Sequence, residues 1–326
     1  MSGKPRRPGV LLNANARGVR RDPSLRERLA RTLPEAHVVA TREAGDVLPA
    51  VSRLLDEGVD ALLVVGGDGT WPGTLTPLLQ NFDAESLPVI VPCRGGTVNT
   101  IARSFGIRTS PEDSLRALLA GKLEEAPRAV VRVVADGEAP RFGWIFVVGA
   151  GVRFLELYYQ EPVLGPRAAL AVVGRVASSA LRGGRLASEL FAPFETELCV
   201  DGDRIGQQRF TVIGAAGVRE IGLGFAPFLT AGDDPERIHL TATDASAVRL
   251  SLELPALRSG WGPNSLSHFP MRESTLELTV PQTCTLDAEL FAPARTFTVS
   301  AGPALRMALP RAGAPGVASW FPKETS

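Results

Sequence analysis

The sequence predicts an α/β domain with a parallel sheet, followed by a mostly antiparallel, β-sandwich-like domain. In the first part, short apolar runs alternate with amphipathic segments, as in a parallel sheet covered by helices. Near residue 128 the pattern changes to alternating strands separated by turns, which is typical of antiparallel sheets. We therefore expect a first domain at 1–128 and a second at 129–307, and the segment at about 308–326 can return to the first.

The predicted strands of the first domain are four short apolar runs. Helices are predicted between them by apolar residues at helical spacing. The helix expected after residue 70 contains Pro72 and Pro77, which predict either a short first helix or a start delayed to about Thr76. The strands are expected at 9–12, 37–40, 61–65 and 88–92, and the helices at 23–33 and 46–57.

Composition excludes several classes of protein. The 326 residues carry 35 basic and 35 acidic side chains, so the net charge is zero and no nucleic-acid partner is expected. The three cysteines are isolated, which fits a reducing cytosol better than a disulfide framework or a zinc site. No apolar run approaches the length of a membrane span. We expect a cytoplasmic protein whose contact with membranes is peripheral.

The segment at 61–70 (ALLVVGGDGT) predicts a buried strand that ends in a glycine-rich loop. Without Cβ atoms, Gly66, Gly67 and Gly69 allow backbone N–H groups to approach an anion, and Thr70 is placed to cap the next helix. Asp68 is unusual beside phosphates, because its charge repels them unless it binds a cation or orients the reacting groups. We therefore expect Mg²⁺-nucleotide chemistry, with little contribution of this loop carboxylate to folding.

Two further loops follow predicted strands. The first is NANARG at 13–18, and the second is GGTVNTIAR at 95–103. Because the carboxyl ends of parallel strands meet at one edge of the sheet, the loops are expected to face one cleft.

These loops, in this order and with Thr41 between them, resemble the nucleotide-binding motifs of the diacylglycerol kinase catalytic-domain family, which includes relatives of sphingosine and ceramide kinases. The resemblance implies an ATP-binding domain similar to those of NAD kinases and phosphofructokinases, a lipid pocket beside the β-rich domain, and ATP and Mg²⁺ as cofactors. By this resemblance the nucleotide is held by Asn13, Thr41, Gly66, Gly67, Asp68, Gly69, Thr70, Gly95, Gly96, Thr97 and Asn99.

The second domain carries a counterpart of the family's Asp-Gly-Glu signature at 287–289. The resemblance makes Glu289 the base that accepts the proton of the lipid hydroxyl, and a base in this role must lie across the cleft from the loop at 66–70. If the segment is a strand, Asp287 lies on the same face and can position Glu289; an ordinary exposed β-turn without a catalytic role is the alternative. Ala288 replaces the family's glycine, which matters only if φ is positive there.

Two other features concern a metal and a position near the phosphates. In relatives an Asp-Asp-Gly turn can hold a structural Mg²⁺; here Pro235 replaces the glycine after Asp234, and an ordinary acidic turn is the alternative. Thr100 stands where many bacterial relatives have Asp.

A helix is expected at 166–182, with Arg167, Arg175 and Arg182 along one edge of an otherwise apolar segment. Such a basic edge suits a membrane surface, but a helix packed on the sheet with its arginines in water is the favoured interpretation. The oligomeric state is left open, and a homodimer is compatible with the sequence.

The function expected is ATP-dependent phosphorylation of a hydroxyl of diacylglycerol or a related sphingoid or ceramide-like lipid, with Glu289, Asp68 and Asp287 at the catalytic site. One alternative is an NAD kinase-like phosphotransferase, which shares the glycine loop. The other is a nucleotide- or lipid-binding homologue without turnover. The sequence does not identify the lipid acceptor.

Overall fold

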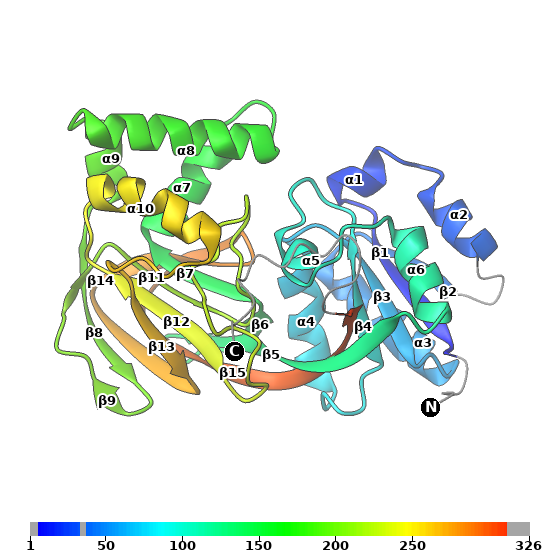
Figure 1. Cartoon of the computed structure of the whole chain (residues 1–326). Coiled ribbons are helices and arrows are strands. Elements are labelled where there is room, and N and C mark those ends of the chain that lie inside the picture. Colours follow the sequence, from blue (N-terminus) through cyan, green and yellow to red (C-terminus); the bar gives the residue numbers. More distant parts are fainter. Residues whose placement is uncertain (1–5, 33–36, 312–326) are drawn as a thin grey trace, which may run out of the picture. The chain divides into compact units, whose positions relative to one another are not determined.

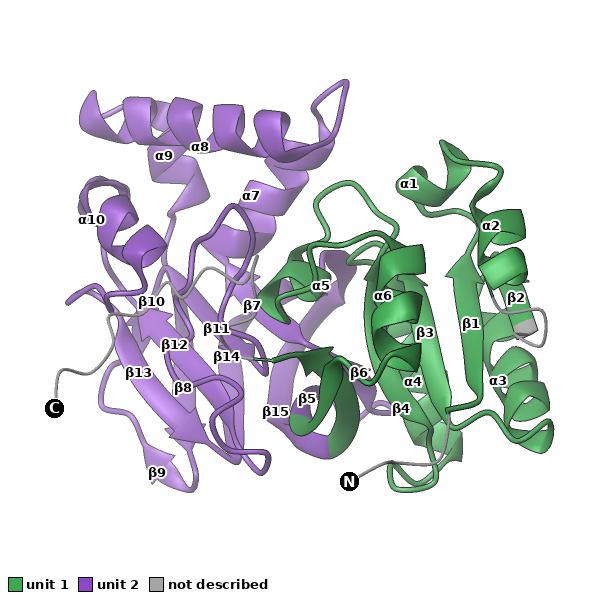
Figure 2. Cartoon of the chain, turned by 45° about the vertical axis from the view of Figure 1, so that its right-hand side comes forward, with its two compact units in different colours: residues 1–128, 304–326 green, residues 129–303 purple. Residues whose placement is uncertain are grey.

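The computed structural model describes residues 6–32 and 37–311, which form two compact units (Figures 1 and 2). Unit 1 is Met1–Arg128 with Ala304–Ser326, and unit 2 is Ala129–Pro303. Most of the expected return at 308–326 lies outside the described residues, and residues 308–311 belong to unit 1.

Unit 1 contains a parallel sheet in the order β2-β1-β3-β4-β15. The apolar runs at its centre are buried because helices cover both faces of such a sheet. The prediction of a parallel α/β domain is confirmed. The strands are β1 (Pro8–Asn13), β2 (His37–Thr41), β3 (Ala61–Gly66), β4 (Val89–Arg94) and the end of β15 (Glu289–Pro310).

The helices of unit 1 follow the strands, but those at 17–20 and 111–119 were not predicted, and the helix after the glycine loop differs from the prediction. Helix α4 (Thr70–Asn81) begins directly after the glycine loop and continues through Pro77, so both expected alternatives for this helix were wrong. Trp71, Leu75 and Leu78 are buried on one side, and their packing offsets the hydrogen bond that Pro77 cannot donate. The others are α1 (Arg17–Arg20), α2 (Leu25–Thr32), the 3₁₀ turn η1 (Ala44–Asp46), α3 (Val47–Asp56), α5 (Thr100–Ser104) and α6 (Pro111–Leu119).

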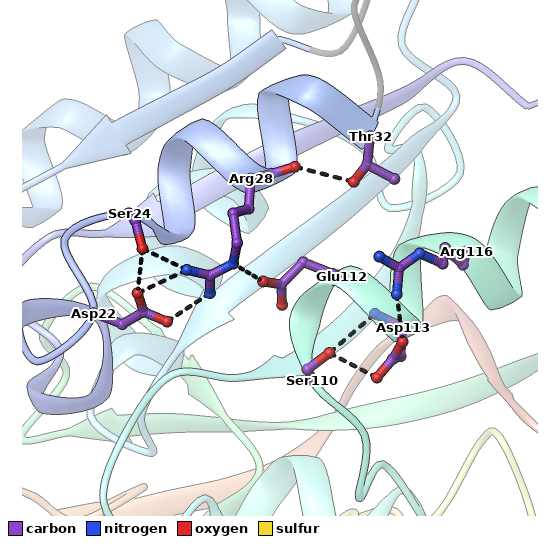
Figure 3. A network of polar contacts seen from close by, with 8 residues as sticks. All are labelled: Asp22, Ser24, Arg28, Thr32, Ser110, Glu112, Asp113 and Arg116. Atoms are coloured by element: carbon purple, nitrogen blue, oxygen red, sulfur yellow. Dashed lines mark hydrogen bonds and ion pairs between the residues drawn. The ribbon is translucent and has the colours of Figure 1, made fainter.

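An arginine joins α2 to α6 (Figure 3). Arg28 donates from Nε to Glu112 at 2.8 Å and from Nη2 to Asp22 at 2.6 Å. The bonds from Arg28 and Ser24 lower the pKa of Asp22 to about 2. The Arg28–Glu112 pair connects residues 84 positions apart and joins the two helices on one side of the sheet.

Unit 2 is built on an antiparallel sheet, as predicted. Its main path runs β13-β12-β11-β7-β14-β15, and β8 pairs with the first half of β14 while β7 pairs with the second half. Irregular pairing between Glu277 and Cys284 separates the halves, and such bulges bend a strand. The strands are β5 (Leu123–Ala135), β6 (Arg141–Gly143), β7 (Ile145–Gly149), β8 (Phe194–Val200), β9 (Asp203–Arg204), β10 (Arg209–Phe210), β11 (Val212–Ala216), β12 (Ile238–Thr243), β13 (Ser267–Met271), β14 (Glu273–Leu286) and β15.

Four helices lie in unit 2, of which only α8 (Pro166–Leu181) was predicted. Helices α7 (Ala150–Tyr159), α9 (Arg185–Leu190) and α10 (Ala247–Ser259) were missed. Helix α7 follows β7 without a polar linker, because Gly149 turns the chain with φ of 85°. No helix in the described part of the chain is both long enough and apolar enough to span a membrane.

Strand β15 contributes to both units. Its first part pairs with β14 in unit 2, and Met307 pairs with Ile90 of β4 in unit 1. Hydrogen bonding is therefore continuous from the antiparallel to the parallel strands, whereas separate sheets had been expected.

Candidate functional site

Three loops meet at the carboxyl edge of the sheet in unit 1, and glycine allows their backbones to touch. A Cβ on Gly18 would lie 2.5 Å from the carbonyl oxygen of Gly95, and one on Gly95 would lie 2.8 Å from the nitrogen of Gly66. A Cβ on Gly96 would collide with Cα of Gly67. These glycines are thus required by loop packing alone, whether or not a ligand binds.

Hydrogen bonds join the first and second loops through Thr70. Asn13 donates from Nδ2 to the Thr70 hydroxyl at 2.8 Å, and the N–H of Gly67 donates to the same oxygen at 3.1 Å. Thr70 was expected to cap α4, but Gly69 occupies the cap position and the hydroxyl closes the loop instead. The loop conformation therefore depends on Asn13 and Thr70 together.

Thr41 and Asn99 hold the neighbouring loops. The carbonyl of Thr41 accepts from the N–H of Ala14 at 2.8 Å, and its buried hydroxyl lies 3.5 Å from the carbonyl of Leu12. Asn99 is buried in the left-handed region with φ of 56°, and its Oδ1 accepts from the N–H groups of Gly95 and Gly96 at 3.1 and 2.7 Å. Both residues position the loops.

Asp68 links the second loop to the third. Its Oδ1 accepts from the N–H of Ile101 at 3.0 Å, near the start of α5. Desolvation raises the pKa of Asp68, while the bonds from Ile101 and Thr100 oppose this rise. The expectation that Asp68 contributes little to the fold is therefore wrong, because its carboxylate satisfies donors at the end of a helix.

Gly69 differs from the other glycines of the loop. It is exposed, has an ordinary φ of −66°, and a Cβ added to it would meet no atom within 4 Å. The fold therefore does not require glycine at this position. The N–H groups of Gly69, Thr97 and Val98 also donate to no atom of the described residues. The second and third loops thus offer backbone donors to an external acceptor.

In unit 2, the predicted strand at 287–289 is a tight turn. Leu286 pairs with Glu289, and Asp287 and Ala288 between them have φ of 49° and 69°, as a two-residue hairpin of type I′ requires. Asp287 and Glu289 therefore do not share one face of a strand, and that expectation was wrong. The replacement of glycine by Ala288 places a Cβ at a positive φ.

The side chain of Asp287 anchors this turn to β7 and the residue before it. It is 2% exposed, and its carboxylate accepts from the N–H of Trp144 at 2.9 Å and from that of Ile145 at 2.8 Å. Tyr159 donates its hydroxyl to the carbonyl of Ala288. Asp287 thus fixes the turn that precedes Glu289, through partners that lie 142 and 143 positions away.

Glu289 extends from this turn into solvent. Partial desolvation nevertheless raises the pKa of Glu289, while the nearby charge of Arg141 opposes the rise. Arg141 lies over the ring of Phe291 at 4.3 Å and lines a pocket of about 70 Å³ together with Leu286 and Cys284. A carboxylate with a raised pKa is a better proton acceptor. That Glu289 faces the loop at 66–70 stays a prediction.

The geometry around Asp234 does not favour a metal. Its Oδ1 accepts from the N–H of Glu236 at 2.8 Å, its Oδ2 lies 3.6 Å from Nε of Arg237, and the carbonyl of Ala231 accepts from Arg219. No group of three or more His, Cys, Asp or Glu side chains suited to a metal ion occurs among residues 6–32 and 37–311.

Sequence reasoning missed Arg141, Tyr159 and the N–H groups of Trp144 and Ile145. Arg141 acts on Glu289 through its charge, and the other groups contact the turn at 287–288 from more than 100 positions away, so no local motif marks them.

Comparisons with known proteins agree with this geometry. Residues 9–131 match the model of the diacylglycerol kinase catalytic domain. A probable YegS-like lipid kinase of Stenotrophomonas maltophilia is 34% identical over 106 residues, which are 32% of this chain and 33% of that protein. A probable YegS-like lipid kinase of Klebsiella pneumoniae is 30% identical over 129 residues, 39% of this chain and 41% of that protein. The chain thus matches less than half the length of these relatives.

Solved structures resemble the whole chain. A putative diacylglycerol kinase from Bacillus anthracis has a TM-score of 0.69 at 16% identity and covers 97% of this chain and 99% of its own. A second diacylglycerol kinase structure from that organism has a TM-score of 0.64 at 15% identity, with 97% and 100% coverage. At this identity the likeness establishes the fold. The three glycine-rich loops all lie within the segment at 9–131 that matches the model of the diacylglycerol kinase catalytic domain, so the likeness to that family covers the candidate site of unit 1.

Proposed function

We propose that this protein is an ATP-dependent kinase that phosphorylates a hydroxyl group of a lipid, with diacylglycerol or a sphingoid or ceramide-like lipid as acceptor. The observation that carries the proposal is the exposed Gly69, which neither packing nor backbone conformation requires. Because Gly69 lies in the loop beside unpaired N–H groups, its missing side chain leaves those donors accessible to a ligand. The unpaired N–H groups of Gly69, Thr97 and Val98 suit the phosphates of a nucleotide.

The lipid acceptor is supported by the family and by Glu289. In the proposed reaction, the acceptor oxygen forms a bond to the γ-phosphorus, the bond from that phosphorus to the β,γ-bridging oxygen breaks, and ADP leaves. Glu289 takes the proton of the hydroxyl, which its raised pKa favours. Asp287, Trp144 and Ile145 hold the turn that carries it.

Mg²⁺ would neutralise charge on the phosphates. Asp68 is the carboxylate of the loops, and its Oδ1 already accepts from Ile101. The chain therefore fits a Mg²⁺ ion held mainly by the nucleotide, with Asp68 as its one carboxylate contact.

The test measures transfer from labelled ATP to a total lipid extract in mixed micelles, followed by identification of the product. Glu289→Gln keeps the shape and removes the basicity, so kcat falls by about 10²–10⁴ while ATP binding is nearly unchanged. Gly69→Ala keeps the N–H but places a methyl group where the phosphate is proposed to lie, which should raise KM for ATP roughly tenfold, about the effect of losing one hydrogen bond, with an unchanged melting temperature.

Matched controls are Glu195→Gln, an exposed carboxylate on β8, and Gly206→Ala, which is likewise exposed and meets no atom within 4 Å. Both should behave as the parent protein. Phosphorylation of NAD without a lipid product, unaffected by Glu289→Gln, would identify an NAD kinase-like enzyme. ATP binding without any product would identify a homologue without turnover.

A further inference from the structure

Large apolar side chains are exposed along one helix of unit 2. Leu170 and Leu181 of α8 are 53% and 62% exposed, and Val163 just before the helix is 67% exposed. We propose that the outer face of α8, formed by Val163, Arg167, Leu170, Arg175, Leu181 and Arg182, binds the surface of an anionic lipid bilayer.

Helix α8 has two distinct sides. Ala169, Val172, Val176 and Ala180 are buried, and Val172 and Val176 pack with Ala150 of α7 and Leu190 of α9. The inner side is therefore fully used by packing within unit 2, and Figure 1 shows α8 running along the ends of α7 and α9. Its solvent side could be entirely polar without any cost to the fold, yet it carries two leucines beside its arginines.

The charge on the outer face has one sign. Helix α8 contains no Asp or Glu. Arg167 and Arg182 form no ion pair with any described carboxylate, and Arg175 pairs with Glu161 at 2.6 Å. An exposed helix of a soluble protein usually carries both signs, which stabilise it through pairs along the helix. The two arginines without carboxylate partners, Arg167 and Arg182, complement an anionic surface.

Small residues lie between these side chains. Ala171 and Gly174 are exposed, and a Cβ on Gly174 would meet no atom within 4 Å. The backbone of α8 can therefore approach a flat surface closely, so that Leu170 and Leu181 enter the apolar layer while the arginines remain at the level of the headgroups.

The neighbouring helix α10 also exposes apolar side chains. Ala247 at the start of α10 packs with Ala180 of α8, and the residues that follow it outward, Val248 and Leu252, are exposed. Apolar side chains thus extend beyond one helix. A second copy of the chain is a less suitable occupant, because two faces rich in arginine would repel each other.

The experiment measures sedimentation of the whole chain with vesicles, without ATP, so that its outcome is independent of the proposed kinase activity. Vesicles of phosphatidylcholine with roughly 30 mol% phosphatidylglycerol are compared with phosphatidylcholine alone. We expect binding to the anionic vesicles only, and a weakening in about 0.5 M NaCl, where the Debye length is only a few ångströms.

Two double variants test the face. Replacing Arg167 and Arg182 by Glu removes two attractive charges and should weaken binding at least about 25-fold, or about fivefold for each arginine. Replacing Leu170 and Leu181 by Ser should weaken binding at least about tenfold. The matched controls are Arg26→Glu on α2 and Val280→Ser on β14; Val280 is 62% exposed, like Leu181. Both should bind as the parent.

All these side chains are exposed, so the variants should retain the parent melting temperature and the activity toward substrate in mixed micelles. A second measurement places an environment-sensitive fluorophore on Leu170→Cys or Val280→Cys. Cys199 is replaced by Ser because it is partly exposed and would also be labelled, whereas Cys93 and Cys284 are buried. With anionic vesicles, the emission of the fluorophore on Leu170→Cys should shift to the blue, and that of the fluorophore on Val280→Cys should not. The proposal would be overturned if the parent protein did not bind anionic vesicles, or if both double variants bound them as tightly as the parent. It would also be overturned if the parent formed a dimer that the variants dissociate and did not bind vesicles.

Discussion

A single carboxylate joins the loop after β3 to the start of α5. Asp68 accepts from the N–H of Ile101 across 33 positions of sequence, beside loops whose backbones touch through Gly66, Gly67, Gly95 and Gly96. The sequence indicates that these residues belong to one site, since each follows a strand. It does not show that the carboxylate is engaged by the protein itself, because that bond depends on how the third loop folds back on the second.

Replacement of Asp68 should therefore affect stability and turnover separately. Asp68→Ala leaves the helix donors without a partner and should lower the free energy of unfolding by about 1 kcal/mol. Asp68→Asn keeps an acceptor and should lower it by roughly half as much. Both variants should lose turnover if the charge orients phosphates or Mg²⁺.

Urea unfolding and kinase assays of the same preparations distinguish the effects. Asp56→Ala on the exposed side of α3 is the control and should change neither quantity. Full turnover in Asp68→Asn would show that Asp68 acts only through the hydrogen bond.

At the scale of elements, the hairpin between β14 and β15 contains an unfavourable residue. Ala288 has φ of 69°, where a Cβ costs about 1 kcal/mol or more. Ala288→Gly should therefore raise the free energy of unfolding by about 1 kcal/mol. Chemical denaturation measures the change directly.

The turn between β8 and β9 provides the opposite substitution. Gly202 has φ of 90° and open space around its Cβ position, so Gly202→Ala should destabilise the protein by a similar amount. If Ala288→Gly has no effect or destabilises, then contacts of the Ala288 methyl group outweigh the backbone strain.

Elements that pack by their own pattern were predictable, and elements that depend on neighbours were not. The four apolar strands of unit 1 and helix α8 follow from periodicity alone. Helix α4 does not, because Pro77 argues against it locally while burial of Trp71 and Leu75 decides the outcome. The turn at 287–288 was read as a strand because the donors that hold it, from Trp144 and Ile145, lie far away in sequence.

For the whole molecule, one buried histidine should set part of the acid sensitivity of folding. His239 is buried, its Nδ1 lies 2.6 Å from the Thr230 hydroxyl, and its Nε2 lies 3.1 Å from Nδ1 of His268. The pKa of His239 is lowered to about 4, mainly by desolvation. The charges of His268 and Arg219 contribute to this lowering of the pKa, and the charge of Asp233 opposes them.

Because the pKa of His239 is about 4 in the folded state and near 6.5 in the unfolded state, the unfolded chain binds more protons between these values. The free energy of unfolding should therefore fall by roughly 2–3 kcal/mol from this group as the pH decreases from about 6.5 to about 4. Its contribution should be constant above and below that window.

Urea denaturation across this range, for the parent and His239→Gln, isolates the effect, because carboxylates titrate equally in both. The variant should show a shallower decline. His268→Gln should have a smaller influence. Parallel curves for the parent and His239→Gln would contradict the assignment.

Strand β15 has a consequence for synthesis on the ribosome. Arg306 donates to the carbonyl of Leu87, 219 positions earlier, and Met307 completes the edge of the sheet beside β4. At elongation rates of about 5–20 residues per second, β4 waits roughly 10–45 s for this partner after it emerges. The nascent unit 1 therefore carries an unpaired strand edge throughout most of translation, and edges of this kind recruit chaperones or neighbouring chains.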